Sequence, residues 1–310
     1  MTALDIFCNH DFPAAAKGLL ESGIAGHRLI GALAEADVAL GQPDVAGVIA
    51  STRLRWTQLT SAGYTNYDRD DLRAAFTARG AALTKSSLVF DQPCAEHIVA
   101  LMFAQARQLP AALAEQRGAR GWPQKALRSR SRLLRGQSVV IAGLGSIARL
   151  VIGMLAPLRM EVTVLRRRVA GDEPAPAAAW DSPEATRAFG AADHVLNVLP
   201  AAPGTDGFFN AARLALVKPG AIFYNIGRGN TVDQPALIAA LTSGRLGAAY
   251  LDVATPEPLP PDHPLWTAPN CFITPHTAGG HEDESLRLVR HFLDNLARFA
   301  AGRALLDRVL

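Results

Sequence analysis

The chain has 310 residues, of which 49% are hydrophobic, and a formal net charge of +3. This length and hydrophobicity suit two α/β domains of ordinary size, and scattered arginines argue against a nucleic-acid surface. No uncharged apolar run approaches the ~20 residues of a membrane span, and no basic and apolar leader opens the chain. Cys8, Cys94 and Cys271 lie far apart, which favours reduced thiols over a disulfide framework. We therefore expect a cytoplasmic protein.

The first ~100 residues alternate apolar runs with helical patterns, which indicates a parallel βα sheet. The predicted strands are 4–8, 45–50 and 56–60, and the predicted helices are 14–22 and 70–78. From Pro93 the apolar spacing predicts one long helix toward Arg117. A polar, Arg-rich stretch over 118–135 follows and contains Trp122.

The most informative segment is 137–148, Gln-Ser-Val-Val-Ile-Ala-Gly-Leu-Gly-Ser-Ile-Ala. A β-branched run enters a glycine turn and a helical pattern follows, which is the context of a dinucleotide-binding fingerprint. Gly143 permits the tight turn, Gly145 leaves room for a pyrophosphate, and Ala148 stands where a third glycine is usual. The helix that opens with Ser146 and Ile147 offers unpaired N–H groups to the phosphates. The alternative is a strand-to-helix turn without a ligand.

A second βα series begins at this fingerprint. Its predicted strands are 138–142, 161–165, 194–199, 221–226, 247–252 and 271–274. Cap residues before Pro183 and Pro235 mark helix starts, 174–179 is predicted to be an Ala/Pro loop, and 282–301 is an amphipathic helix.

Because the fingerprint lies near residue 140, a βα domain precedes the nucleotide domain. The final helix has no strand after it, so we expect it to return to that first domain. The predicted fold is α/β, with two flavodoxin- or Rossmann-like parallel-sheet domains, a cleft between them, and the first domain discontinuous. The predicted substrate domain is 1–99 with 282–310, and the predicted dinucleotide-binding domain is 100–281.

Three further motifs follow the glycine turn in order. They are Asn225-Ile-Gly-Arg-Gly229, Leu251-Asp-Val253 with Glu257-Pro-Leu-Pro260, and Thr274-Pro-His-Thr-Ala278. With the glycine turn, this set resembles the D-isomer-specific 2-hydroxyacid dehydrogenase family over nearly the whole chain. Ala95-Glu96-His97 is similar to the family's crossing helix, and Asn295-Leu296 to its closing helix. Within the family, the chain most resembles the glyoxylate/hydroxypyruvate reductases.

The resemblance implies a hydride-transfer site built on three residues. His276 corresponds to the proton donor in reduction, and a reference pKa near ~6.5 lets an imidazole work in both directions around neutrality. Glu257 corresponds to the carboxylate that orients this imidazole. Arg228 corresponds to the guanidinium that grips the substrate carboxylate, a fork that lysine cannot reproduce. The alternatives are a histidine in a structural turn, a solvated glutamate and a solvated loop arginine.

The resemblance also implies binding residues. For the cofactor these are Gly143, Gly145, Ser146, Ile147, Arg166, Arg167, Leu199, Pro200, Thr205, Ile226 and Asp252. For the substrate they are Ala62, Gly63, Arg228 and His276, because the family holds the substrate carboxylate on main-chain N–H groups of a small-residue loop such as Ser61-Ala62-Gly63. Trp122 is either a pocket aromatic donated by a second subunit or a packing residue.

The end of the predicted strand 161–165 bears on the choice of nicotinamide cofactor. An NAD-selective fold usually places an acidic residue there to bond the ribose 2′-hydroxyl, whereas this chain continues with Arg166-Arg167-Arg168. A guanidinium attracts a 2′-phosphate, so NADP(H) is the expected cofactor and NAD(H) is the alternative. The alternative is an exposed basic turn.

The sequence therefore predicts an NADPH-dependent reductase that converts a 2-oxo acid of the glyoxylate or hydroxypyruvate type to the D-2-hydroxy acid. The alternatives are a dehydrogenase for a bulkier 2-oxocarboxylate or phosphoglycerate, and a non-catalytic NAD(P)-sensing protein of the same fold. No metal is predicted, and a homodimer is expected from the resemblance. Lys85-Ser86-Ser87 and Pro200-Ala-Ala-Pro203 depart from the family pattern, and these departures bear on the choice of substrate.

Overall fold

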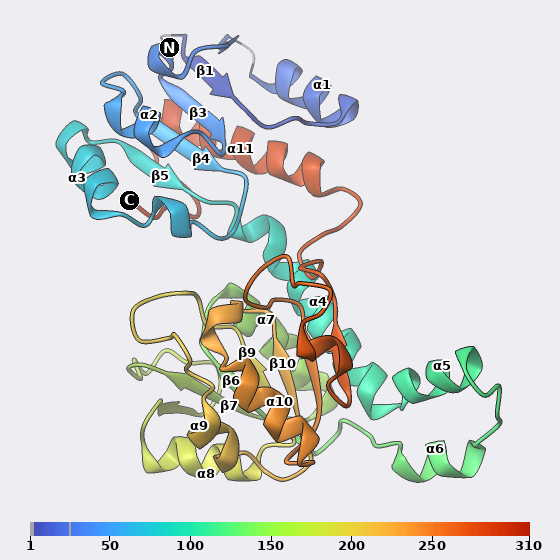
Figure 1. Ribbon diagram of the computed structural model, residues 1–310. Helices are drawn as coiled ribbons and strands as arrows, with labels where there is room; N and C mark the ends of the chain where they lie inside the picture. Colours follow the sequence, from blue (N-terminus) through green and yellow to red (C-terminus); the bar gives the residue numbers. More distant parts are fainter. Residues whose placement is uncertain (1–2, 25) are drawn as a thin grey trace. The chain divides into compact units, whose positions relative to one another are not determined.

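The computed structural model describes residues 3–24 and 26–310. The chain forms two compact units, Met1–Asp91 with Gly280–Leu310 and Gln92–Gly279. Each unit contains one parallel sheet with helices packed on it (Figure 1). The predicted α/β class with two parallel-sheet domains, the first discontinuous, is therefore confirmed.

The first unit is a five-stranded parallel sheet in the order β2-β1-β3-β4-β5. This 2-1-3-4-5 order is the flavodoxin-like arrangement. The strands are β1 (Asp5–Cys8), β2 (Arg28–Ile30), β3 (Val38–Gly41), β4 (Trp56–Leu59) and β5 (Ala82–Thr84). The helices are α1 (Ala14–Gly23), α2 (Val45–Ala50), α3 (Asp70–Arg79) and α11 (Glu284–Ala300).

The strand predicted at 45–50 is wrong, because this segment is helix α2. The Asp44 side chain caps it by accepting a hydrogen bond from the Gly47 N–H at 2.8 Å, and Val48 is fully buried. A six-residue apolar run fits a buried strand or a short helix equally well, so periodicity could not separate them. The cap at Asp44 was the signal for the helix.

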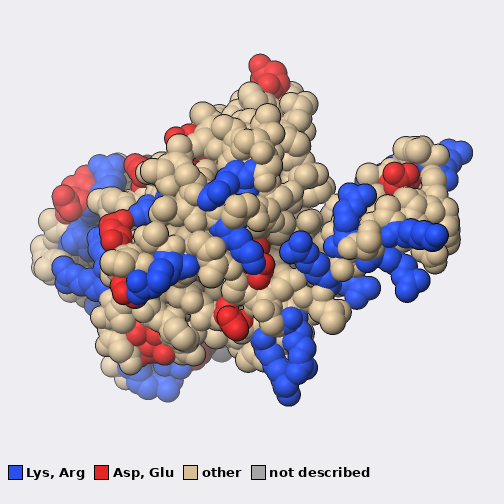
Figure 2. Space-filling model, turned by 90° about the horizontal axis from the view of Figure 1, so that it is seen from below, with Lys and Arg blue, Asp and Glu red and all other residues tan. Residues whose placement is uncertain are grey.

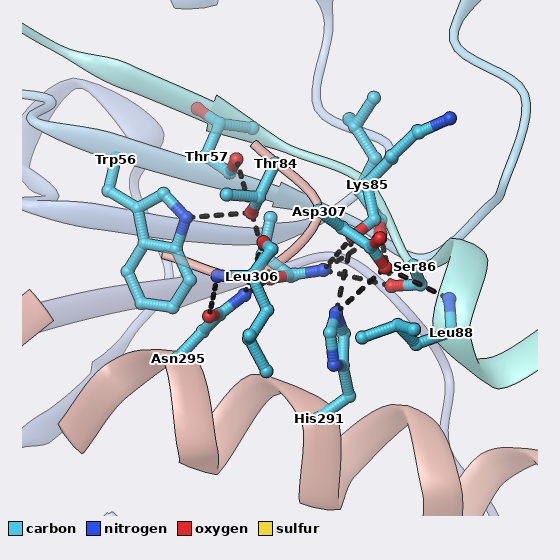
Figure 3. Close-up of polar contacts among 12 residues, drawn as sticks. Trp56, Thr57, Thr84, Lys85, Ser86, Leu88, His291, Asn295, Leu306 and Asp307 are labelled. Carbon is cyan, nitrogen blue, oxygen red and sulfur yellow. Dashed lines mark hydrogen bonds and ion pairs between the residues drawn. The ribbon is translucent and has the colours of Figure 1, made fainter. Parts of the chain in front are cut away.

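The closing helix α11 packs on the first sheet, as predicted. Its Phe292 ring stacks on Trp56 with ring centroids 5.3 Å apart. Asn295 is fully buried, donates to Gln58 Oε1 and to the Leu306 carbonyl, and accepts from the Leu306 N–H (Figure 3). The C-terminal segment thus belongs to the core of this unit, which explains why the unit is built from both ends of the chain.

The second unit is a seven-stranded parallel sheet in the order β8-β7-β6-β9-β10-β11-β12. This is the Rossmann order with a seventh strand, and the order reverses between β6 and β9. The strands are β6 (Ser138–Ala142), β7 (Glu161–Arg166), β8 (Ala177–Ala179), β9 (His194–Asn197), β10 (Ala221–Asn225), β11 (Leu246–Leu251) and β12 (Cys271–Ile273). The helices are α7 (Ser146–Leu155), α8 (Pro183–Ala191), α9 (Ala211–Leu216) and α10 (Gln234–Thr242).

The six strands predicted for this unit are confirmed within two residues, but the Ala/Pro loop predicted at 174–179 is partly wrong. Ala177–Ala179 forms the edge strand β8 and pairs with Val164–Arg166. An edge strand bonds to one neighbour, so it needs fewer ladder donors than an inner strand and tolerates the prolines that precede it.

The long helix predicted from Pro93 to Arg117 is two helices, α4 (Ser87–Ala106) and α5 (Leu109–Arg117). The break lies at Gln108, which has a left-handed φ of 57°. Helix α4 starts before Pro93, and the Leu88 N–H in its first turn donates to the carboxylate of Asp307 at 2.9 Å. This partner lies 219 residues away in sequence, so no local cap announced the start.

A third helix, α6 (Gln124–Arg130), lies inside the Arg-rich stretch. Together α5 and α6 project from the second unit as an arm (Figure 1). No described helix, within 3–24 or 26–310, has both the length and the apolarity to cross a membrane.

Candidate active site

The predicted site residues of the second unit follow the carboxyl ends of its strands. Strand register places six residues in one row across the sheet: Leu165, Ala142, Asn197, Asn225, Leu251 and Ile273. Gly143, Arg228, Asp252 and His276 each come one to three residues after a member of this row. Parallel α/β sheets bind their ligands at this edge. The glycine turn, the arginine and the histidine therefore lie along one edge of one sheet.

Arg228 is held between two glycines that the packing requires. A Cβ at Gly227 would lie 2.5 Å from the Leu199 carbonyl oxygen, and one at Gly229 would overlap the Ala254 carbonyl. The Gly-Arg-Gly turn therefore fits tightly between the end of β9 and the loop after β11. In the described part of the chain the Arg228 guanidinium forms no ion pair, and its Nη1 donates to the Gly227 carbonyl at 2.7 Å.

A buried polar network fixes the backbone of the same turn. Asn197, Asn225 and Thr231 are almost completely buried. Asn197 Nδ2 donates to Asn225 Oδ1 and to Thr231 Oγ1. Asn225 Oδ1 also accepts from the Gly227 N–H, and Thr231 Oγ1 donates to the Arg228 carbonyl. Since buried polar groups are costly unless bonded, this network pins the arginine turn in one conformation.

His276 and Glu257 form a direct pair. His276 Nδ1 lies 2.7 Å from Glu257 Oε2, and the other carboxylate oxygen accepts from the Ala254 N–H at 3.0 Å. Both side chains are partly exposed, at 55% and 38%. Glu257 therefore connects the histidine to Ala254, the residue that Gly229 touches.

The backbone at His276 has an unusual conformation. Its φ is 53°, in the left-handed region, which a non-glycine residue holds at a cost of about 1–3 kcal/mol when the surroundings determine it. The His276 N–H donates to the carbonyls of Asp252 and Thr274, both at 2.8 Å. The Asp252 carboxylate then accepts from the N–H groups of Thr277 and Ala278. The histidine is thus presented by a turn that is bonded on both sides.

The glycine turn after β6 has the geometry of a dinucleotide cradle. Gly143 has a φ of 103°, and a Cβ there would lie 3.2 Å from Val198 Cγ2. A Cβ at Gly145 would meet no atom within 4 Å, so this position opens on free space. Gly145 precedes α7 and offers no side-chain cap. Ser146 and Ile147 are the first two residues of α7, where N–H groups have no partner within the helix; such a helix start fits the pyrophosphate of a nicotinamide dinucleotide.

The remaining predicted cofactor positions differ in their surroundings. Leu199 and Ile226 are buried apolar residues at the carboxyl edge, while Pro200 is exposed. Thr205 is buried, and its hydroxyl donates to the carbonyls of Pro200 and Ala202 inside its own loop. Thr205 therefore shapes the loop after β9.

The basic strand end of β7 is partly neutralised. Arg166 Nη1 pairs with Asp172 at 3.0 Å and with Glu173 at 2.6 Å. Hydrogen bonds from backbone N–H groups, together with the bond from Arg166, lower the pKa of Glu173 to about 2. Arg167 Nη2 donates to the Pro203 carbonyl at 2.6 Å, and its guanidinium lies over the Trp180 ring. Sequence reasoning missed the two acids because they follow the strand end by several residues.

Ala62 and Gly63 lie in the first unit, in the loop after β4. Ser61 Oγ donates to the Gly63 carbonyl at 2.6 Å, and the Ser61 carbonyl accepts from the Ser86 N–H at 2.9 Å. Lys85 lies over the Tyr64 ring beside this loop. Within 3–24 and 26–310, no group of three or more His, Cys, Asp or Glu residues is placed to hold a metal ion.

Thr274 at this edge and His97 on helix α4 form a contact that the motifs did not predict. His97 Nε2 lies 3.2 Å from Thr274 Oγ1, and Thr274 Oγ1 donates to Asp252 Oδ1 at 2.7 Å. Both residues occur inside motifs that carry the family resemblance. Their proximity could not be read from the sequence, because 177 residues separate them.

Comparisons with known proteins identify the family. The family model of the D-isomer specific 2-hydroxyacid dehydrogenase, NAD binding domain, matches residues 99–278. The human glyoxylate reductase/hydroxypyruvate reductase is 32% identical over 274 residues, which cover 86% of this chain and 78% of that protein. The D-3-phosphoglycerate dehydrogenase of Mycobacterium bovis is 31% identical over 288 residues, which cover 91% of this chain and 52% of that protein.

A solved structure extends the likeness to the whole chain. The D-isomer specific 2-hydroxyacid dehydrogenase from Xanthobacter autotrophicus Py2, crystallised with NADPH and MES, matches with a TM-score of 0.83 and 27% identity. The match covers 100% of this chain and 98% of that one. The chain belongs to the D-isomer specific 2-hydroxyacid dehydrogenase family. It is an oxidoreductase that uses a nicotinamide cofactor, and the resemblance seen in its motifs is confirmed.

Proposed function

We propose that the protein reduces a small 2-oxo acid of the glyoxylate or hydroxypyruvate type to the D-2-hydroxy acid, with NADPH as the preferred reductant. The observation that carries the proposal is the His276–Glu257 pair at 2.7 Å, on the same sheet edge as Arg228 and the glycine turn. The human relative named for these two substrates supports the substrate class.

The proposed mechanism assigns a task to each residue. A dihydronicotinamide cofactor, which the glycine turn at Gly143 and Gly145 would hold, would supply the hydride. As the carbonyl carbon accepts it, negative charge develops on the carbonyl oxygen, and His276 donates a proton there. Its Nδ1 is engaged by Glu257, so Nε2 is the nitrogen that delivers the proton. The Glu257 carboxylate fixes the ring orientation and stabilises the protonated imidazole.

Arg228 holds the substrate. A guanidinium without an ion-pair partner is available for a bidentate bond to the substrate carboxylate, and it draws electron density from the adjacent carbonyl. The glycines on either side of Arg228 and the buried amide network keep the backbone of this residue in place. We assign the N–H groups of Ala62 and Gly63 to the same carboxylate.

The preference for NADPH rests on the end of β7. Arg166 is already paired with two carboxylates, those of Asp172 and Glu173. We therefore assign the 2′-phosphate first to Arg167, whose guanidinium donates to the Pro203 carbonyl through one nitrogen, Nη2. Asp252 is assigned to the nicotinamide side through the turn that it organises. A relative crystallised with NADPH supports this preference.

We also propose that the protein works as a homodimer in the cytoplasm. The arm helices α5 and α6 contain no buried residue. Leu113 in α5 is 48% exposed, and Trp122, between the two helices, is 90% exposed. An exposed apolar surface of this kind usually marks an interface. Cys8, Cys94 and Cys271 form no disulfide, which fits a reducing compartment.

The charge of the arm favours one way of docking. The segment 107–135 contains eight Lys or Arg residues and one acidic residue, Glu115, and Figure 2 shows basic side chains over much of the arm. Two arms would repel each other, whereas the rest of the chain has more acidic than basic residues. We therefore propose that the arm of one copy packs against the part of the other copy that lies outside its arm.

A phosphoglycerate dehydrogenase activity is the second candidate, because that relative matches 91% of this chain. A steady-state panel of glyoxylate, hydroxypyruvate, phenylpyruvate and 3-phosphohydroxypyruvate, each with NADPH and NADH, separates the candidates. The proposal predicts the highest kcat/KM for glyoxylate or hydroxypyruvate with NADPH. A higher kcat/KM for 3-phosphohydroxypyruvate or phenylpyruvate would overturn the proposed substrate class. A higher kcat/KM with NADH would overturn the proposed preference for NADPH. Tight NADPH binding without any oxidation would indicate a non-catalytic sensor.

A further inference from the structure

A chain of three side chains leads from helix α4 to the turn that carries His276. His97 Nε2 lies 3.2 Å from Thr274 Oγ1, and Thr274 Oγ1 donates to Asp252 Oδ1 at 2.7 Å. Asp252 is buried, and its carboxylate accepts from the N–H groups of Thr277 and Ala278, the two residues after His276. All of these residues belong to the second unit.

The direction of these hydrogen bonds follows from counting protons. A threonine hydroxyl has one proton, and here it is donated to Asp252. Thr274 Oγ1 can then only accept from the imidazole, so His97 Nε2 carries a proton and donates. Burial lowers the pKa of His97, against a smaller opposing effect of the Asp252 charge. The donor is therefore a neutral imidazole with its proton on Nε2.

We propose that His97 and Thr274 are positioning residues for the proton donor: they orient Asp252, and through it the turn that presents His276. The left-handed backbone of His276 makes this support necessary, because such a residue keeps its conformation only where its neighbours determine it. Asp252 holds the turn through two N–H groups, and it can do so only in one side-chain orientation. Thr274 and His97 fix that orientation through Oδ1, the same carboxylate oxygen that accepts from the N–H groups of Thr277 and Ala278.

This inference rests on the proposed role of His276. Its functional consequence is a loss of turnover, because a small displacement of a catalytic group lowers the rate without removing a binding contact. His97→Phe and Thr274→Val each remove one link while they keep most of the side-chain volume. We expect each to lower kcat about 10-fold. The dissociation constant of NADPH should change less than kcat, because neither residue is assigned to the cofactor directly and Asp252 is assigned only to its nicotinamide side.

Conservative variants separate positioning from packing. Thr274→Ser keeps the hydroxyl, and His97→Gln places an amide N–H donor near the position of Nε2. Both should retain most of the wild-type kcat. The matched control on the same helix is Glu96→Gln, an exposed residue whose carboxylate accepts from Gln92; its kcat should equal that of the wild type.

A double-mutant cycle tests the connection itself. If His97 acts through Thr274, the His97→Phe/Thr274→Val enzyme should lose about as much kcat as either single variant, rather than the product of about 100-fold. Melting temperatures confirm that each variant is folded. The inference is overturned if the losses multiply, if the single variants keep wild-type kcat, or if Thr274→Ser is as impaired as Thr274→Val.

The wild-type enzyme and His276→Gln serve as references in the same assay. A wild type without turnover, or a His276→Gln enzyme with normal turnover, would contradict the proposed function. A normal wild type and an impaired His276→Gln enzyme, together with unaffected His97 and Thr274 variants, would contradict this inference alone.

Discussion

At the scale of single residues, the backbone around Arg228 packs closely on two neighbouring loops because Gly227 and Gly229 have no side chains. Gly227 lies against the Leu199 backbone and Gly229 against the Ala254 backbone, so the turn approaches two neighbouring loops at once. The Ala254 N–H bonds to Glu257, which in turn bonds to His276. The arginine turn and the histidine pair are therefore linked through one backbone contact.

We predict that Gly229→Ala lowers turnover at least about 100-fold and destabilises the protein by about 1–3 kcal/mol. The added methyl group meets a carbonyl group that cannot move without displacing Glu257. Gly153→Ala in helix α7 is the control, since a Cβ there meets no atom within 4 Å and should be neutral or mildly stabilising. Steady-state kinetics and urea unfolding measure both effects. Equal behaviour of the two variants would contradict the packing argument.

At the same scale, the limits of sequence reasoning are physical. The motifs located Arg228, Glu257 and His276, because each follows a strand end and strand ends meet at one edge. They did not reveal that Asp172 and Glu173 pair with Arg166, because this pairing depends on the folded path of the loop after β7. Nor did they reveal that His97 reaches Thr274.

At the scale of elements, a strand with an apolar run of its own was predictable, whereas a strand that depends on its pairing was not. Ser138–Ala142 agrees with its prediction residue for residue, because β-branched residues lead directly into a glycine turn. Ala177–Ala179 has no such signal, and its pairing with β7 alone makes it a strand. Helix α4 shows the same dependence on distant partners, because the bond to its first turn comes from Asp307.

Strands β6, β9 and β10 bury a titratable group between them. His194 is buried, with Nδ1 3.1 Å from the Tyr224 hydroxyl and Nε2 2.6 Å from Gln137 Oε1. Burial lowers the pKa of His194 from its usual 6.5 to about 4. The unfolded chain therefore binds more protons than the folded protein between these two values, and the free energy of unfolding falls as the pH falls.

We predict that acidification from pH 7 to pH 5 costs about 2 kcal/mol of stability through His194. In that range the carboxylates with lowered pKa, such as Asp193, remain ionised and contribute little. His194→Gln should be less stable at pH 7 but show a flatter dependence on pH. Urea unfolding at pH 7, 6 and 5 measures both slopes. Equal slopes for the two proteins would rule out His194 as the cause.

At the scale of the whole molecule, the arm is the part that the fold of a single chain leaves unexplained. Its helices bury no residue, and its basic surface contrasts with the acidic excess elsewhere. We predict a dimer in solution, and Leu113→Glu should shift it toward monomer because the new charge enters the interface. Leu216→Glu, on helix α9 outside the arm and 41% exposed, is the control. Sedimentation equilibrium measures the mass. A monomeric wild type would contradict the proposed assembly.

The central claim is that one edge of the second sheet presents a nicotinamide cradle, a substrate cation and a proton donor together. The most direct test compares the turnover of the wild type with that of His276→Gln, using NADPH and the best 2-oxo acid of the panel. We predict that kcat falls at least about 100-fold, the usual scale for loss of a general acid. The dissociation constant of NADPH should change by less than about twofold. A His276→Gln enzyme with near-normal turnover would contradict the account.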